Sequence, residues 1–230
     1  NLQIEDIVSS WVGLRPLIHE DGKSPSELSR KDEIFISSKG LISIAGGKLT
    51  GFRKMAERTI DVVVKQRYKQ NKTPISTSAT EDLKLSGGNF KNPEDIPNYI
   101  TDLSNTYSQL QITEQQIHDL VYKYGTNTPH IIEIYQELLP KNTKLSTTQR
   151  LLLAELHYSI RHEMVTNLSD FLIRRTARLY FERETIEETY FLLLDELAKQ
   201  LQWNKKQKLQ YLREFEQEYQ AVLSFIPQQA

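Results

Sequence analysis

The sequence has no cysteine, and only nine glycines and eight prolines are spread over its 230 residues. Without cysteine the chain can form no disulfide, thiolate metal site or thiol nucleophile, which suits a reducing cytoplasm. No apolar run approaches the roughly 20 residues of a membrane-spanning helix, and no signal peptide is expected at the start. The formal net charge of −1 provides no basic field for nucleic acid, so we expect no nucleic-acid partner.

The two parts of the chain show different patterning, and together they predict an α+β fold that is mainly α. Residues 1–75 alternate short apolar runs with turn residues, which predicts strands near 7–12, 33–37 and 41–45 and one helix after Gly51. Residues 80–230 carry apolar side chains at helical spacing and predict an all-helical domain. Because Asn1 rather than Met precedes a strand-like segment, we expect a piece of a longer protein.

Helix starts in the second part are indicated by capping signatures, in which a Ser, Thr or Asn is followed three residues later by Glu or Gln. Thr113, Ser146 and Thr185 each begin such a sequence ahead of an apolar stripe. Asn204 can cap a last helix that carries Leu209. We therefore expect helices to begin directly after these four positions.

A glycine pair at the end of the third predicted strand is the first candidate site. It lies in the segment Gly46-Gly47-Lys48-Leu49-Thr50, which leads into the predicted helix. Two glycines let the backbone turn sharply and approach a ligand, while free N–H groups at the helix start and the Lys48 ammonium favour a negative group. The P-loop and three-glycine dinucleotide patterns are both absent, so the anion must also be held elsewhere.

Two arginines near the ends of predicted strands extend this hypothesis. Arg15 is held between Gly13 and Pro16, and Arg30 precedes the next strand. A guanidinium can donate two parallel hydrogen bonds to a phosphate or carboxylate. Together with Lys48 they predict an anion pocket.

Other polar residues point to structural roles. The five histidines lack metal-ligand spacing, so we expect no metal site. Arginines 174, 175, 178 and 183 lie near four glutamates, which favours ion pairs over contact with anionic lipid. The histidines are His19, His118, His130, His157 and His162.

Two groups of motifs, taken in order, resemble the C-terminal third of FAD-dependent glycerol-3-phosphate dehydrogenases and alpha-glycerophosphate oxidases. The first group is Ser-Ser-Trp-Val-Gly-Leu-Arg-Pro-Leu at 9–17, Ser-Arg-Lys-Asp at 29–32 and Gly-Leu-Ile-Ser-Ile-Ala-Gly-Gly-Lys-Leu-Thr-Gly-Phe-Arg-Lys-Met-Ala at 40–56. The helical part resembles the family at 120–125, 155–164 and 170–176. The resemblance covers nearly the whole chain, and it divides it into a remnant of the FAD and substrate domain at 1–75 and a helical C-terminal domain at 80–230.

The resemblance implies an oxidoreductase of glycerol metabolism that converts sn-glycerol 3-phosphate to dihydroxyacetone phosphate. FAD would take the hydride, and a membrane quinone would take the electrons. In that picture Arg15, Arg30 and Lys48 hold substrate, and residues 46–50 lie at the flavin. A cytoplasmic location is implied, with peripheral contact on the inner face of the cell membrane and a homodimer left open. Where many relatives have Thr-Tyr, this chain has Gly51-Phe52, so any contact made by those two hydroxyls is absent.

Two alternatives stay open. An oxidase of the same family would pass electrons to oxygen and make hydrogen peroxide, but those enzymes commonly carry a long insertion where this chain has only residues 18–28. A hypothesis of another class makes the chain a helical interaction module that is inert alone, since the nucleotide-binding fold is absent from it. No residue is a persuasive general base for the hydride transfer, so no catalytic residue is predicted.

Overall fold

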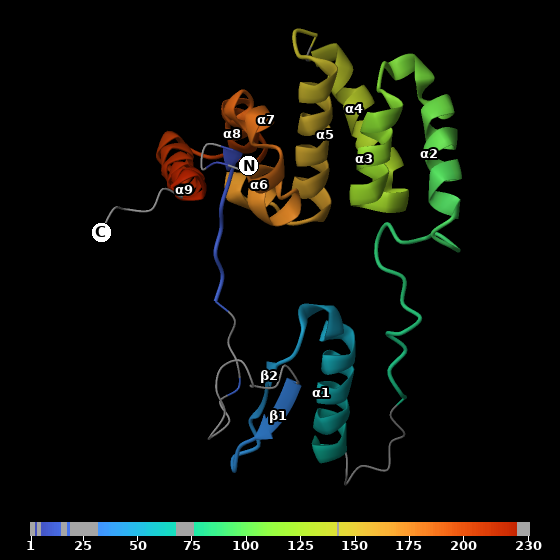
Figure 1. The fold of residues 1–230 in the computed structure, drawn as a ribbon, viewed down its shortest axis with the longest axis vertical. Helices are drawn as coiled ribbons and strands as arrows, with labels where there is room; N and C mark the ends of the chain where they lie inside the picture. Colours follow the sequence, from blue (N-terminus) through green and yellow to red (C-terminus); the bar gives the residue numbers. More distant parts are fainter. Residues whose placement is uncertain are drawn as a thin grey trace. The chain divides into compact units, whose positions relative to one another are not determined.

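The fold is taken from a computed structural model, which describes residues 3, 6–14, 18, 32–67, 76–141 and 143–224. The chain forms two compact units (Figure 1). One combines Asn1–Val12 with Leu85–Ala230 and is called the helical unit; the other, Gly13–Lys84, is called the hairpin unit. The division predicted at 1–75 and 80–230 stays a prediction.

The hairpin unit is built from two antiparallel strands and one helix. Strand β1 (Asp32–Ile36) pairs with β2 (Ile42–Gly46), with Ile34 opposite Ile44. Gly40 closes the turn between them with φ +84°, and its N–H donates to the carbonyl of Ser37. A short 3₁₀ helix, η2 (Leu49–Gly51), then leads into α1 (Phe52–Arg67), which confirms the strands predicted near 33–37 and 41–45 and the helix predicted after Gly51.

The hairpin unit has no closed core among its described residues. No residue of α1 is buried, although Met55 and its neighbours lie against the strands. Phe35 and Ile36 on β1 are about half exposed, and Leu49 is 90% exposed. Several apolar side chains of this unit therefore stay uncovered by its described residues.

The helical unit is a set of helices packed around α5 (Thr147–His162), whose residues 151–159 are all buried. Helices α2 to α5 lie side by side (Figure 1). A helix buried all round belongs to the centre of a core rather than to its surface. The longer helices besides α5 are α2 (Asp95–Thr106), α3 (Glu114–Tyr124), α4 (Thr128–Leu138), α8 (Tyr190–Gln200) and α9 (Lys205–Leu223).

Short helical turns connect these elements. They are η3 (Ser108–Leu110), η4 (Gly125–Asn127), η5 (Leu139–Lys141), the π-helical η6 (Asp170–Arg175), α6 (Arg178–Phe181) and α7 (Arg183–Glu187). Within the described part of the chain the fold is therefore mainly helical with one two-stranded sheet, as predicted.

Three of the four predicted caps are confirmed, and one is wrong. Thr113, Ser146 and Asn204 each accept a hydrogen bond from the N3 backbone N–H in a full capping box. Thr185 lies inside α7 instead, and its hydroxyl donates to the carbonyl of Glu182 at 2.7 Å. Its apolar stripe starts a separate helix, α8, after Thr189.

The predicted strand at residues 7–12 is also wrong. This segment has no regular secondary structure and binds the helical unit as an extended strap. The N–H of Ser10 donates to the carbonyl of Val222 at 3.0 Å, and the ring of Trp11 lies 4.9 Å from that of Tyr180. Its backbone hydrogen bond goes to the last turn of a helix rather than to a strand, so this strand-like segment forms no sheet.

A pair of glycines, Gly87 and Gly88, lies at the start of the helical unit and packs against the junction between α3 and α4. The carbonyl of Gly87 accepts a hydrogen bond from the N–H of Thr126 at 2.9 Å. A Cβ on Gly125 would lie 1.9 Å from that carbonyl oxygen, so no other residue fits there.

No helix in the described part of the chain is both long and apolar enough to cross a bilayer.

Candidate functional site

The turn from β2 to α1 has the geometry expected for a site that meets a ligand through its backbone. Gly46 and Gly47 both adopt positive φ, at +75° and +81°, which favours glycine. Lys48 is extended, and the N–H of Gly51 donates to its carbonyl at 2.8 Å. The N–H groups of Lys48, Leu49 and Thr50 precede the first helical hydrogen bond and are available to an outside acceptor.

Close packing fixes the backbone of Gly47. A Cβ at this position would lie 2.7 Å from Sδ of Met55 and 3.2 Å from Cβ of Asp32. Arg58, one turn after Met55, places Nη2 at 2.6 Å from Oδ1 of Asp32. This ion pair joins α1 to the strand residue opposite Gly46, so helix, strand and turn are held as one piece.

The Lys48 ammonium is exposed and has no ion-pair partner within the described ranges. An unpaired cation next to free backbone N–H groups attracts an anion or an electron-rich ring edge. Leu49, 90% exposed, and Phe52, 59% exposed, add apolar surface beside this charge. The turn therefore combines the donors and the apolar surface that a planar, polar-edged cofactor needs.

Arg15 and Arg30 lie outside the described residues. Their predicted convergence on Lys48 stays a prediction. Among the predicted site residues, the structure places Gly46, Gly47, Lys48, Leu49 and Thr50 in one continuous turn.

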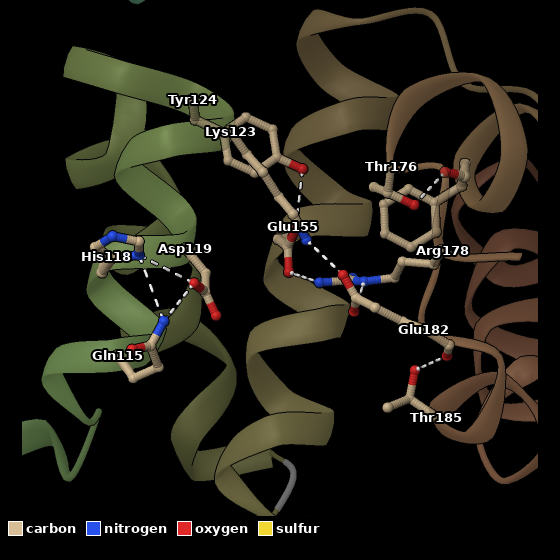
Figure 2. Close-up of polar contacts among 11 residues, drawn as sticks. Gln115, His118, Asp119, Lys123, Tyr124, Glu155, Thr176, Arg178, Glu182 and Thr185 are labelled. Atoms are coloured by element: carbon tan, nitrogen blue, oxygen red, sulfur yellow. Dashed lines mark hydrogen bonds and ion pairs between the residues drawn. The ribbon is translucent and has the colours of Figure 1, made fainter. Parts of the chain in front are cut away.

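A second polar centre lies in the helical unit, between α3, α5 and α6 (Figure 2). Glu155 is buried on α5 and accepts hydrogen bonds from Arg178 Nη2 at 2.8 Å and from the Tyr124 hydroxyl at 3.0 Å. Nε of Arg178 donates to Glu182 at 2.9 Å, and Lys123 on α3 donates to the other oxygen of Glu182 at 3.1 Å. We call these residues the Glu155 network.

The electrostatics of the Glu155 network favour a charged Arg178 and a charged Glu182. Burial alone would lower the pKa of Arg178, but the carboxylates of Glu155 and Glu182 outweigh it and raise the pKa. Burial would raise the pKa of Glu182, yet Arg178 and Lys123 lower it. Burial and the neighbouring Glu155 carboxylate raise the pKa of Tyr124, so its hydroxyl stays a proton donor.

The basic segment at 174–183 is structural in its described contacts, as predicted. Arg174 pairs with Asp170 at 3.1 Å, and Arg175 donates to the carbonyl of Glu163. The Glu155–Arg178 pair itself was not predicted, because the two residues lie 23 positions apart and no local pattern connects them.

The histidines of the described residues form no metal site. No three His, Asp or Glu side chains in those ranges cluster as metal ligands would. His157 is buried and lies with Nε2 at 2.8 Å from Glu196. Burial lowers the pKa of His157, which favours a neutral ring that donates to the carboxylate.

Comparison with known proteins gives the family. The family described as the C-terminal domain of alpha-glycerophosphate oxidase matches residues 78–208. The aerobic glycerol-3-phosphate dehydrogenase of Bacillus subtilis is 36% identical over 90% of this chain, and that of Staphylococcus epidermidis is 37% identical over 94%. The chain belongs to the FAD-dependent glycerol-3-phosphate dehydrogenase and alpha-glycerophosphate oxidase family.

A solved structure from this family of glycerol-3-phosphate dehydrogenases has the same fold. The glycerol-3-phosphate dehydrogenase from Bacillus halodurans, complexed with FAD, is 35% identical and superposes with a TM-score of 0.81 over 100% of this chain. The chain spans 43% of that protein, 37% of the B. subtilis relative and 38% of the S. epidermidis relative. It corresponds to their C-terminal portion.

Proposed function

We propose that this chain is the C-terminal part of an FAD-dependent enzyme that oxidises sn-glycerol 3-phosphate to dihydroxyacetone phosphate and passes the electrons to quinone. The observation that carries the proposal is the similarity, over at least nine-tenths of the chain, to proteins named aerobic glycerol-3-phosphate dehydrogenase. The relative from B. halodurans was solved with FAD. The geometry of the Gly46–Thr50 turn fits that cofactor.

The turn supplies the contacts that a flavin ring would use. Gly46 and Gly47 let the backbone come close to a ligand, and the N–H groups of Lys48, Leu49 and Thr50 lie ahead of the first helical hydrogen bond. When bound, FAD supplies the acceptor for the substrate's hydride. A helix N-terminus and an ammonium favour the negative charge that develops at the ring during this transfer.

Substrate binding is assigned to three cations. Lys48 is the one whose position is described, and its unpaired ammonium is available to a phosphate or a developing negative charge. Arg15 and Arg30 complete the proposed set through bidentate contacts to the phosphate. The base that removes the hydroxyl proton is not assigned to any residue of this chain.

The acceptor and the cellular setting are part of the proposal. Quinone is preferred over oxygen because only eleven residues, 18–28, stand in the sequence between the two motifs, where oxidases commonly carry a long insertion. The oxidase alternative is supported by the description of the family that matches residues 78–208. A quinone acceptor favours a cytoplasmic protein with peripheral contact at the inner membrane face, and a homodimer is compatible with it.

A chimera tests this proposal. Residues 1–230 would replace the corresponding C-terminal part of the B. subtilis relative, and oxidation of glycerol 3-phosphate would be followed with a soluble quinone and with oxygen. We expect activity with quinone. Arg15→Ala should lower kcat/KM by a factor that corresponds to about 2 kcal/mol or more of activation free energy, the scale of a lost charged hydrogen bond. Arg213→Ala, on exposed surface of α9, serves as the matched control.

Within the same chimera, Lys48→Met should raise KM for glycerol 3-phosphate and slow flavin reduction. Lys39→Met, in the exposed β1–β2 turn, should change neither. A flavin-loaded chimera that reduces neither acceptor, or one in which Lys48→Met and Lys39→Met behave alike, would contradict the assigned function or site.

The alternative of another class is a helical interaction module without activity of its own. It is supported by the lack of a closed core among the described residues of the hairpin unit and by the share of the relatives that the chain spans. Incubating residues 1–230 with FAD separates the two readings. The proposal requires that the chain alone retain no flavin after desalting and that the chimera retain it.

A further inference from the structure

The helical unit contains a cavity whose walls combine charged, hydroxyl and apolar groups. It has a volume of about 170 Å³ and lies against the Glu155 network, with Arg178, Glu155 and Glu182 in its wall. Leucines 120, 151 and 152 supply the apolar part of the lining. Nothing in the proposed oxidation uses this cavity.

One donor in the wall has no partner. Arg178 is only 9% exposed, and its Nε and Nη2 donate to Glu182 and Glu155. Nη1 is buried and makes no hydrogen bond with any described residue. A buried guanidinium N–H without an acceptor is unfavourable, so a molecule in the cavity that accepts from Nη1 is stabilised.

The threonine hydroxyls of the cavity wall add both a hydrogen-bond donor and hydrogen-bond acceptors. The Thr148 oxygen accepts from Gln116 Nε2 at 3.3 Å, which leaves the Thr148 hydroxyl hydrogen free to donate. The Thr185 and Thr189 hydroxyls donate to the carbonyls of Glu182 and Thr185, which leaves their oxygens free to accept. A ligand hydroxyl can use both kinds of group because it donates and accepts.

The charges of the wall exclude an ionic ligand. Glu155 and Glu182 balance Arg178 and Lys123 within the network. Asp119 adds a half-exposed carboxylate to the lining, which disfavours an anion, and the N–H of Arg178 Nη1 needs an acceptor, which a cation cannot supply. The favoured ligand is neutral.

The size and the apolar lining of the cavity narrow the class of ligand further. A cavity of about 150 Å³ holds a ligand of roughly six heavy atoms. The leucines would pack against CH groups and disfavour a cluster of waters. We propose that this cavity is a binding site for a small neutral polyol of three to four carbons, held by Arg178 Nη1 and the threonine hydroxyls.

The test uses residues 1–230 with glycerol as the probe. Two-dimensional ¹H–¹⁵N NMR would follow the Nε–H of Arg178, assigned by its loss in Arg178→Lys, and saturation-transfer spectra would follow glycerol. We expect a saturable shift of the Arg178 signal and transfer to the glycerol CH protons. 1-Propanol, which has the same number of carbons and a single hydroxyl, should bind at least five-fold more weakly.

A blocking variant and a matched control locate the site. Thr148→Trp places a bulky ring at the exposed edge of the cavity and should abolish both signals. Thr101→Trp, on exposed surface of α2 outside the cavity, should leave them unchanged. The proposal would be overturned if glycerol caused no saturable shift, which would mean that the cavity holds water only. Equal signals in the two tryptophan variants would also overturn it. Neither result depends on flavin or on the proposed oxidation.

Discussion

Nη2 of Arg178 lies 2.8 Å from Oε1 of Glu155, and the two side chains are only 11% and 4% exposed. Such a pair is stable only while both partners are present, because removing one leaves the other charged and buried. Glu155 also holds the Tyr124 hydroxyl, so the same carboxylate joins α3, α5 and α6. The pair therefore matters most for the alignment of these helices.

Removing one partner of this pair should destabilise the helical unit strongly. Glu155→Leu or Arg178→Met alone is expected to lower the free energy of unfolding by about 3–5 kcal/mol. The double variant should recover a large part of the loss, because no unpaired buried charge remains between them. Urea unfolding followed by circular dichroism measures all three against Arg213→Met, and additive single effects would contradict the coupling.

The helix caps predict a contrast among residues with the same sequence signature. Ser146→Ala and Asn204→Ala each remove an N-cap acceptor and should cost about 1 kcal/mol of unfolding free energy. Thr185→Ala should stay within about 0.5 kcal/mol, because Thr185 caps no helix. Thermal or urea unfolding compares the three. A loss at Thr185 equal to that at Asn204 would mean that this residue caps α7 or α8 after all.

The glycine turn makes a prediction for the hairpin unit. Gly47→Ala forces a side chain into positive φ, which costs about 1–2 kcal/mol, and also pushes on Met55. Hydrogen exchange of the β1 and β2 amides should therefore speed up in this variant. Gly51→Ala is the matched control, since its Cβ would meet only an ordinary contact at 3.9 Å. Equal exchange in the two variants would show that Gly47 is not constrained.

His157 predicts how stability changes with pH. Burial lowers its pKa below the ordinary value of 6.5, so the unfolded chain takes up a proton first as the pH falls. The free energy of unfolding should drop below about pH 6.5, until the pH passes the folded pKa. Glu196, whose own pKa is lowered, adds a further loss at more acidic pH. His157→Gln should flatten the curve between pH 7 and 5, whereas His118→Gln, on exposed surface, should not.

Local features of this chain were predictable from sequence, and long-range contacts were not. The strands near 33–37 and 41–45 were predictable, because apolar patterning and turn residues act over a few residues. Residues 7–12 are rich in residues that favour strands but dock on Tyr180 and Val222, which no local rule indicates. The helix cap predicted at Thr185 is wrong for a related reason, because a new helix begins after Thr189, where the apolar stripe starts.

The candidate site shows the same limit. The conformation of Gly46 and Gly47 follows from their lack of a Cβ, and the exposure of Lys48 follows from its place ahead of a helix. The ion pair of Arg58 with Asp32 that braces the turn joins residues 26 positions apart and was not predicted. Whether Arg15 and Arg30 reach Lys48 depends on residues outside the described ranges.

The strap formed by Ser9, Ser10 and Trp11 has a consequence for protein engineering. Because these residues bind Tyr180 and Val222, the helical unit is assembled from two separate stretches of sequence, with the hairpin unit inserted between them. An expression boundary drawn at residue 80 would remove the strap and uncover the ring of Tyr180 and the end of α9. Joining residue 12 to residue 85 through a short glycine-serine loop would instead keep both stretches in one smaller polypeptide.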